Sequence, residues 1–337
     1  MSRVAMLLIG SVGFLAGAIV LLNRPNQTKS SSTIMLYCAA SNRAVMEEIR
    51  EAYEEETGHR IEIQYGPSQT LLSSIEVAER GELFLPADDS YLDFAKEKSL
   101  IEERIPIARM QAGIAVAKGN PKGIHGLDDL GRGDVRLVMA NPETAAIGKV
   151  AKKTLASVDA WEPLERANIG YRATVNEVAN DIMLGAADAG IVYDAVLHTY
   201  PDLEFVSIDE LAPAASDIMV GVIASTEQPQ AALHFARYLS ASDRGLKHYA
   251  DHGFGVVAGD EWDDQPELSI FAGSMLRPAI EETIAAFERR EGITVHRVYN
   301  GCGILVAQMK AGQHPDAYFA CDQEFMNQVH DLFPEPV

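Results

Sequence analysis

The sequence is poor in cysteine and in positive charge, and each shortage excludes a class of protein. Three cysteines in 337 residues, with no CxxC pair, exclude a disulfide-rich framework and a cysteine zinc site. Only 28 Lys and Arg residues stand against 49 Asp and Glu residues, a formal net charge of −21. Nucleic acid and anionic lipid are bound through clustered Lys and Arg. The composition therefore predicts no nucleic acid partner and no electrostatic docking on a membrane surface.

The motifs that usually carry catalysis are also missing. The sequence contains no GxSxG turn, no HExxH, and no pair of carboxylates that stands out from its acidic helix faces. The nine histidines show no metal-ligand spacing on one predicted helix face. We therefore expect that the protein is not an enzyme and has no catalytic residue, no metal site and no cofactor.

One long apolar run lies near the N-terminus, over residues 4–22. Its 19 or so uncharged residues are enough to cross a hydrocarbon core about 30 Å thick. The run lacks a clear small-x-small cleavage site, and Cys38 lies too far downstream for a lipoprotein signal. We expect an uncleaved signal anchor over residues 4–22, with a cleaved signal peptide as the alternative. The polar stretch over 23–33 is typical of a short tether.

After the tether, short apolar runs alternate with amphipathic stretches, which predicts an α/β fold with a largely parallel sheet. After the strand that begins at Ile34, for example, Val45, Met46, Ile49 and Tyr53 recur at helical spacing. The predicted strands cover residues 34–40, 60–65, 113–119, 135–140, 189–193 and 218–224.

An internal repeat links the two ends of this region. Residues 268–326 echo residues 35–92 at an offset of 234, pairing Gly58 with Gly292, for example. The echo follows the same predicted order of strands and helices, and it stops at the end of the sequence after about 70 residues. A fixed period of self-similarity is typical of duplication. We therefore expect one complete unit followed by an incomplete second copy.

Two serines stand where a predicted strand turns into a predicted helix, namely Ser41 and Ser68. The first N–H groups of a helix have no intrahelical acceptor, and the helix dipole makes that end electropositive. Two such turns facing each other would form a cradle for a tetrahedral anion without Lys or Arg. Donors alone favour a fully deprotonated oxyanion over protonated phosphate, which needs an acceptor. Serine at a helix start is also a common N-cap, so both interpretations stay open.

Several segments, in order, resemble the molybdate-binding proteins of ABC importers. They are the strand end before Ser41, the turn at Ser68, Pro86-Ala87-Asp88, Asn141-Pro142-Glu143 with Gly148, Asn176-Glu177-Val178, the run from Ala187 to Tyr193, and residues 240–255. The resemblance covers about residues 34–257. It implies a two-lobed type II periplasmic binding protein that closes on its ligand.

The resemblance also implies a set of ligand-binding residues. Ser41 and Ser68 would donate hydroxyl and backbone N–H groups from lobe one. Ile147 and Val178 would donate backbone N–H groups from lobe two, and the Tyr193 hydroxyl would complete the site. The ligand would be molybdate or tungstate, which the protein would hand to an ABC transporter permease on the periplasmic or extracytoplasmic side of the membrane.

The expected organisation has three parts. Residues 1–33 form the signal anchor and tether, residues 34–258 the two-lobed solute-binding domain, and residues 259–337 the incomplete second copy. Within the domain, lobe one comprises residues 34–110 and 225–258, and lobe two comprises residues 111–224.

Two alternatives stay open for the function. The same fold could bind another anion or ferric iron, although iron requires carboxylate and phenolate ligands. The chain could also be a tethered sensor or scaffold outside transport. In the second copy, Cys302 stands in place of Ser68 and lobe two has no counterpart, so we expect no oxyanion site there. We expect Cys302 and Cys321 to be unpaired, with a disulfide between them as the alternative.

Overall fold

The computed structural model describes residues 33–333. The predicted anchor over residues 4–22 lies outside this range. Among the helices of residues 33–333, none combines the length and the apolar character needed to cross a bilayer.

The strands and helices follow the alternation that the sequence predicts. The strands are β1 (Thr33–Ala39), β2 (Arg60–Gly66), β3 (Leu83–Leu85), β4 (Ile101–Ala117), β5 (Leu137–Ala140), β6 (Asn168–Arg172), β7 (Ala189–Tyr193), β8 (Leu203–Val206), β9 (Ala215–Ile223), β10 (Gly255–Val256), β11 (Glu267–Gly273), β12 (Thr294–Asn300) and β13 (Ala317–Phe319). The α-helices are α2 (Arg43–Thr57), α3 (Ser68–Ala78), α4 (Ser90–Glu97), α5 (Leu127–Leu130), α6 (Ala146–Ala156), α7 (Trp161–Ala167), α8 (Val175–Met183), α9 (Pro229–Ser240), α10 (Gly245–Asp251), α11 (Arg277–Glu291), α12 (Cys302–Lys310) and α13 (Gln323–Asn327). Short 3₁₀ helices are η1 (Ala40–Asn42), η2 (Ala195–Thr199), η3 (Asp209–Leu211), η4 (Ser274–Leu276) and η5 (His330–Leu332).

Local sequence explains how the first βαβ unit forms. The predicted face of α2, with Val45, Met46, Ile49 and Tyr53, is buried, and the Tyr53 ring packs on α9, while most of the glutamates of α2 are exposed. Helix α2 ends at Gly58, whose left-handed φ of +74° suits a residue without Cβ. The chain then returns as β2, which pairs in parallel with β1. This unit confirms the predicted alternation of strand and helix.

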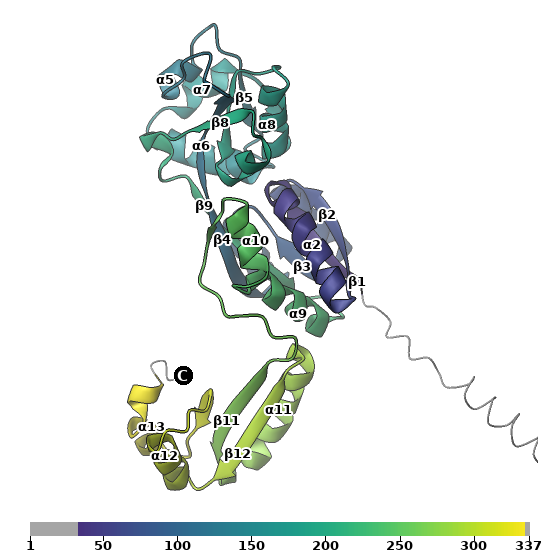
Figure 1. Cartoon of the computed structure of the whole chain (residues 1–337), viewed down its shortest axis with the longest axis vertical. Helices are drawn as coiled ribbons and strands as arrows, with labels where there is room; N and C mark the ends of the chain where they lie inside the picture. The colour runs from purple at the N-terminus through teal and green to yellow at the C-terminus, as the bar shows by residue number, and fades with distance from the viewer. Residues whose placement is uncertain (1–32, 334–337) are drawn as a thin grey trace, which may run out of the picture. The chain divides into compact units, whose positions relative to one another are not determined.

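The large sheet runs in the order β2-β1-β3-β9-β4-β7-β5-β6, with β8 and β10 also paired to β4. Figure 1 labels β1, β2, β3, β4, β5, β8 and β9 of this sheet. Pairing is parallel among β2, β1 and β3 and between β5 and its neighbours β6 and β7. It is antiparallel where β9 and β4 join the sheet. The α/β class is therefore as predicted, but the sheet is mixed and not largely parallel, because β4 and β9 join its parallel groups of strands by antiparallel pairing.

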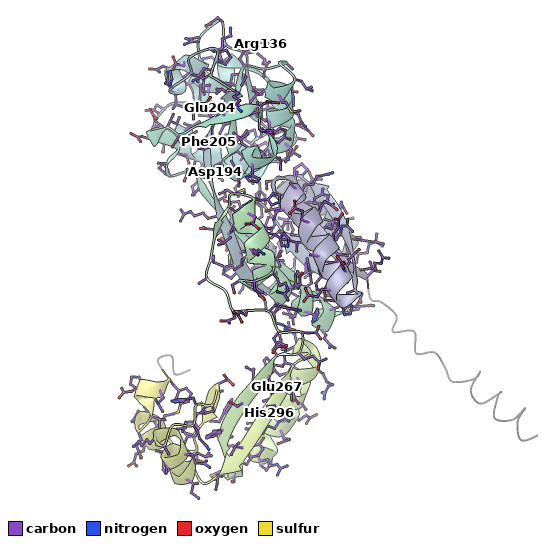
Figure 2. All side chains as sticks on the ribbon, viewed as in Figure 1. Arg136, Asp194, Glu204, Phe205, Glu267 and His296 are labelled. Atoms are coloured by element: carbon purple, nitrogen blue, oxygen red, sulfur yellow. A yellow bond between two sulfur atoms is a disulfide. The ribbon has the colours of Figure 1, made fainter. Side chains whose placement is uncertain are left out.

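Strand β4 joins two halves of this sheet, the first with β2, β1, β3 and β9 and the second with β7, β5 and β6. It pairs with β9 from Ile101 to Gln111 and with β7 from Ala112 to Val116. The strand paired with β4 changes from β9 to β7 between Gln111 and Ala112, one residue after the predicted lobe boundary at 110/111. Asp194, which directly follows β7, fixes this crossing, because its Oδ1 accepts the Gln111 N–H at 3.0 Å (Figure 2).

Strand β9 lies elsewhere than the predicted lobe division implies. The division assigns residues 111–224 to lobe two, whereas β9 pairs with β3 of the first half, Leu83 lying opposite Val222. The chain therefore returns to the first half of the sheet at about Ala215, before α9. The reason is that two long strands, β4 and β9, run antiparallel to each other and share the passage between the halves.

The C-terminal segment repeats the first βαβαβ arrangement. Its sheet has the order β12-β11-β13, as β2-β1-β3 has in the first unit. Residue pairs also match at the predicted offset, Glu267 lying opposite Thr294 as Thr33 lies opposite Arg60. Two small apolar clusters, one on each side of this three-stranded sheet, form its core.

Candidate functional site

A small cavity lies where several helices of the first 260 residues begin. Its lining residues are Ala39, Ala40, Ser41, Gly66, Pro67, Ser68, Ala87, Ala145, Ala146, Ile147, Ala173, Thr174, Val175 and Tyr193, none of them charged. Its volume is about 20 Å³, on a scale where one water molecule needs about 10–15 Å³. In this conformation the cavity has room for about one water molecule and excludes a ligand the size of a sugar or nucleotide.

Four helical segments start at this cavity. They are η1, which leads into α2, and α3, α6 and α8, which begin at Ser68, Ala146 and Val175. The first N–H groups of each segment have no acceptor within their own helix. Each helix start is electropositive because of the dipole. The cavity therefore gathers hydrogen-bond donors and positive potential without any cationic side chain.

The two predicted serines line one side of the cavity. Ser68 is 2% exposed, and its Oγ accepts the Ala87 N–H at 3.1 Å. This contact uses one lone pair of the hydroxyl oxygen and leaves the hydroxyl proton to donate elsewhere. Ser41 is 8% exposed and lies in η1, where its Oγ accepts from Asn42 Nδ2 at 3.5 Å. Pro67, which precedes Ser68, has no N–H to offer.

Ile147 lies on the opposite side, as the second residue of α6. Its side chain is buried, and its backbone N–H belongs to the turn that starts the helix. Gly148 lets this turn approach the end of β5, because a Cβ at Gly148 would lie 2.6 Å from the Ala140 carbonyl oxygen. Ile147 is therefore placed by a close contact between helix and strand that only glycine allows.

Tyr193 ends β7 and is fully buried at the cavity. Its hydroxyl lies 2.7 Å from Ser216 Oγ on β9, which is buried as well. Burial raises the pKa of Tyr193 well above its usual value, so the phenol stays neutral and keeps its proton. When Ser216 donates to the phenol oxygen, the Tyr193 proton is available to a ligand.

Val178 does not line the cavity, in contrast to the prediction. Its N–H donates to the Thr174 carbonyl oxygen at 3.4 Å, one turn into α8. Its side chain packs on Gly190 of β7, where an added Cβ would lie 2.5 Å from Val178 Cγ1. Val175, the first residue of α8, lies at the cavity instead. The structure thus brings together Ser41, Ser68, Ile147 and Tyr193 and replaces Val178 by Val175.

A sequence signal for Val175 was present in the capping pattern of α8. Thr174 and Glu177 form a Thr-x-x-Glu motif, which marks Thr174 as the N-cap residue. In the structure, Thr174 Oγ1 accepts the Glu177 N–H at 3.3 Å. The residue after an N-cap carries the first unpaired N–H of the helix. The capping motif therefore points to the Val175 N–H as the backbone donor of α8.

Two contacts join the sides of the cavity. The Gln69 N–H donates to the Thr144 carbonyl oxygen at 3.2 Å, and Lys149 Nζ donates to Ser90 Oγ at 2.8 Å. Lys149 also lies over the Tyr91 ring, 4.5 Å from its centroid. Burial lowers the pKa of Lys149. These contacts hold α3 and α4 close to the start of α6, next to the cavity.

Nothing in the described residues offers a metal site. Residues 33–333 hold no group of three or more His, Cys, Asp or Glu side chains placed to bind a metal ion. Asp88 lies near the cavity but outside its lining, and its carboxylate accepts the Ser90 N–H at 3.2 Å. The site is therefore one of neutral donors.

The C-terminal segment carries a disulfide at the matching place. Cys302 and Cys321 are bonded to each other, with 6.5 Å between their Cα atoms, so the expectation of two unpaired thiols is wrong. They correspond to Ser68 and Ala87 at the offset of 234. The Cys321 N–H donates to Cys302 Sγ at 3.2 Å, as the Ala87 N–H donates to Ser68 Oγ. Cys302 follows β12 and Cys321 follows β13, the strands on either side of β11, and both sulfurs lie beside Gly273 at the end of β11.

Proteins with similar sequences include binding proteins for molybdate. The molybdate-binding protein ModA of Mycobacterium tuberculosis is 24% identical over 218 residues, which cover 64% of this chain and 82% of that protein. The molybdate-binding protein ModA of Escherichia coli is 26% identical over 182 residues, covering 51% of this chain and 70% of that protein.

Solved structures show the same fold with different ligands. The periplasmic molybdate-binding protein of Azotobacter vinelandii matches with a TM-score of 0.58 at 16% identity, over 67% of this chain and 100% of that one. The sulfate-binding protein SubI of M. tuberculosis also matches with a TM-score of 0.58 at 16% identity, over 82% of this chain and 99% of that one. Their likeness supports the two-domain fold.

The family match covers most of the chain. The bacterial extracellular solute-binding protein family matches residues 34–255 and 268–333. This result agrees with the resemblance to molybdate-binding proteins and with an extracytoplasmic location. The chain belongs to the bacterial extracellular solute-binding protein family, whose members are substrate-binding transport proteins and not enzymes.

Proposed function

We propose that the chain captures a tetrahedral oxyanion, molybdate or tungstate, for import by an ABC transporter permease. The observation that carries this proposal is the meeting of four helix starts and the Tyr193 hydroxyl at a cavity without charged side chains. In the proposed complex, Ser41, Ser68 and Tyr193 donate hydroxyl protons. The backbone N–H groups of Ile147 and Val175 donate from the other side.

The donor set argues for a fully deprotonated anion. Backbone N–H groups have no lone pair to accept a proton from the ligand. Ser68 Oγ already accepts from Ala87, and Tyr193 is paired with Ser216. A phosphate that keeps one proton near neutral pH would need a serine hydroxyl to accept instead of donate, and a buried donor left without an acceptor costs about 1–3 kcal/mol. Molybdate, tungstate and sulfate carry no such proton at that pH, so phosphate is the anion that the site rejects.

Ferric iron fits this cavity poorly. A ferric site needs anionic oxygen ligands such as carboxylates and phenolates. No carboxylate lines the cavity, and burial raises the pKa of Tyr193 and keeps its hydroxyl protonated. A ligand anion gains from those same neutral donors, because it brings the charge that the helix starts stabilise.

The proposed transport role includes the remaining parts of the chain. Residues 4–22 would anchor the protein on the extracytoplasmic side, with residues 34–258 as the two-lobed binding domain. Residues 259–337 would be an incomplete duplicate of lobe one, supported by the shared strand register at an offset of 234. Cys302 and Cys321, which are bonded to each other, stand at the positions of Ser68 and Ala87, so we expect no second oxyanion site in residues 267–321.

Isothermal titration calorimetry tests the ligand. The protein is titrated at neutral pH with molybdate, tungstate, sulfate and phosphate, and ferric citrate serves as the iron arm. Saturable 1:1 binding of molybdate or tungstate, at least tenfold tighter than phosphate, is the expected result. Heat from ferric citrate alone would overturn the oxyanion assignment. Heat from sulfate alone would leave an oxyanion site with a different ligand.

A thermal unfolding series gives an independent readout. A ligand that binds only the folded state adds RT ln(1 + [L]/Kd) to its stability, about 2.7 kcal/mol at 100 times Kd. The unfolding temperature should therefore rise with molybdate concentration and stay constant with phosphate. An equal rise with both anions would show a general salt effect and contradict the proposal.

A further inference from the structure

The disulfide of the C-terminal segment differs from a buried structural cross-link, because its two sulfur atoms have different surroundings. Cys302 is 6% exposed, whereas Cys321 is an exposed residue. Cys321 also lines a cavity of about 530 Å³, together with Asp322, Met326, His330 and other residues. A thiol in solution therefore approaches the disulfide from the side of Cys321, the exposed residue at this cavity, and not from the side of the buried Cys302.

Cys302 is placed to leave as a thiolate. It is the first residue of α12, a helix of nine residues, and the positive end of the helix dipole stabilises a thiolate there. Its Sγ also accepts the Cys321 N–H at 3.2 Å. A sulfur with a stabilised thiolate is the better leaving group in thiol–disulfide exchange.

The backbone makes room for this disulfide at one glycine. Gly273, the last residue of β11, corresponds to Ala39 of the oxyanion cavity at the offset of 234. A Cβ at Gly273 would collide with Cys321 Sγ and lie 2.8 Å from Cys302 Sγ. The disulfide therefore fills the space that in the first unit belongs to the cavity.

We propose that the Cys302–Cys321 disulfide is a thiol-exchange site whose attacked sulfur is Cys321 and whose leaving group is Cys302. The co-reactant is a small thiol such as glutathione. Its thiolate attacks Cys321 Sγ, a bond forms between these two sulfurs, and the Cys302–Cys321 bond breaks. The electron pair of the broken bond goes to Cys302 Sγ, and the proton of the attacking thiol has gone to solvent.

A second thiolate completes the cycle. It attacks the glutathione sulfur of the mixed disulfide, so glutathione disulfide forms and Cys321 leaves as a thiolate. In total, two thiols are oxidised to one disulfide and the protein disulfide is reduced to two thiols, with two electrons transferred. This inference does not depend on the oxyanion site, because its residues all belong to the C-terminal segment.

A trapping experiment on the whole oxidised protein tests the direction of exchange. Reduced glutathione is added first, an excess of iodoacetamide follows after a short interval, and peptides are mapped by mass spectrometry. We expect glutathione on Cys321 and carbamidomethyl on Cys302 in the same molecules, at least tenfold more often than the reverse. Cys38, which is buried, should stay unmodified and serves as the internal control.

Three results would overturn the proposal. Glutathione could be found mainly on Cys302, it could be divided equally, or it could react only after the protein is unfolded in urea. The first two would refute the direction, and the third would identify an inert structural disulfide.

Two single variants test the leaving group separately. Cys321→Ser leaves the Cys302 thiol alone, and Cys302→Ser leaves the Cys321 thiol alone. The alkylation rate of Cys321→Ser should reach its half-maximal value at a pH about one unit or more below that of Cys302→Ser. Equal pH profiles would contradict the role of the α12 start. Circular dichroism establishes that each variant folds, and the trapping experiment on the unaltered protein decides the question if one does not.

Discussion

Residues 33–87 and residues 267–321 share one backbone plan and carry different chemistry. Both have the strand order of a parallel βαβαβ unit, and the paired residues match at an offset of 234. Even a side-chain contact repeats, since Glu54 Oε1 accepts the Ile61 N–H at 2.9 Å and Glu288 Oε1 accepts the Val295 N–H at 2.8 Å. The strand register and this glutamate contact are therefore the same in both segments, although the residues at the carboxyl ends of their strands differ.

The difference lies in a few side chains at the carboxyl ends of the strands. Ser68 and Ala87 line a cavity in the first segment, and Cys302 and Cys321 close a disulfide at the same places in the second. Function thus depends on the residues placed on the backbone rather than on the fold itself. Exchanging those residues between the two segments should therefore exchange their chemistry.

Introducing the disulfide of the C-terminal segment at the matching positions of residues 33–87 should abolish oxyanion binding. The variant Ala39→Gly, Ser68→Cys, Ala87→Cys reproduces the residues of the C-terminal disulfide, because the 68–87 contact matches the 302–321 contact within about 0.1 Å. A disulfide there fills the cavity, so calorimetry should show at least a 100-fold loss of molybdate affinity. Dithiothreitol should restore part of the binding by opening the disulfide.

The matched control for this triple variant is Ser68→Cys alone. It removes the hydroxyl donor without closing a disulfide, so its affinity should not change on reduction. Recovery of binding in the control, or no change in the triple variant on reduction, would show that the cavity is not the site of the disulfide effect.

Removing a single donor should have a smaller effect. In Ser68→Ala the anion loses one hydroxyl donor, and a hydrogen bond to a charged group contributes about 1.5–3 kcal/mol. We expect about a 10- to 100-fold loss of molybdate affinity by calorimetry. Ser73→Ala is the control, since Ser73 is an exposed residue of the same helix. An equal loss in both variants would place the effect in helix stability instead of the cavity.

The phenol of Tyr193 provides a test of the second side. Tyr193→Phe removes a neutral donor from the cavity and should lower the affinity for molybdate about tenfold. Ser216→Ala keeps the phenol and removes only its buried partner at 2.7 Å, so we expect a smaller loss of affinity. A larger loss in Ser216→Ala than in Tyr193→Phe would show that the phenol does not face the ligand.

How much of this site the sequence could predict depends on the kind of group involved. In the proposed complex Ser41, Ser68 and Tyr193 donate through side chains, and their positions at strand ends were readable from the alternation of strand and helix. Ile147 and Val175 would donate through backbone N–H groups, which no residue type marks. The choice between Val175 and Val178 depends on where α8 starts, and the capping residue Thr174 decides it.

The fold shows the same division. Strand order within the first βαβ unit followed from local patterns, and the repeat at an offset of 234 was visible in the sequence. The placement of β9 in the first half of the sheet was not, because it depends on pairing between Leu83 and Val222, which lie far apart in the chain. The Cys302–Cys321 disulfide likewise required the distance between two strand ends.

The smallest effect on affinity separates packing from binding at α8. Val178→Ala removes two buried methyl groups that pack on Gly190, which costs about 2 kcal/mol of stability and should lower the unfolding temperature by several degrees in calorimetric scans. Molybdate affinity should stay within about twofold, since Val178 does not line the cavity. Val175→Pro, which removes the N–H at the first helical position where proline is tolerated, should leave stability nearly unchanged and weaken binding about tenfold. If Val178→Ala weakened molybdate binding and Val175→Pro did not, the backbone N–H donor would be that of Val178.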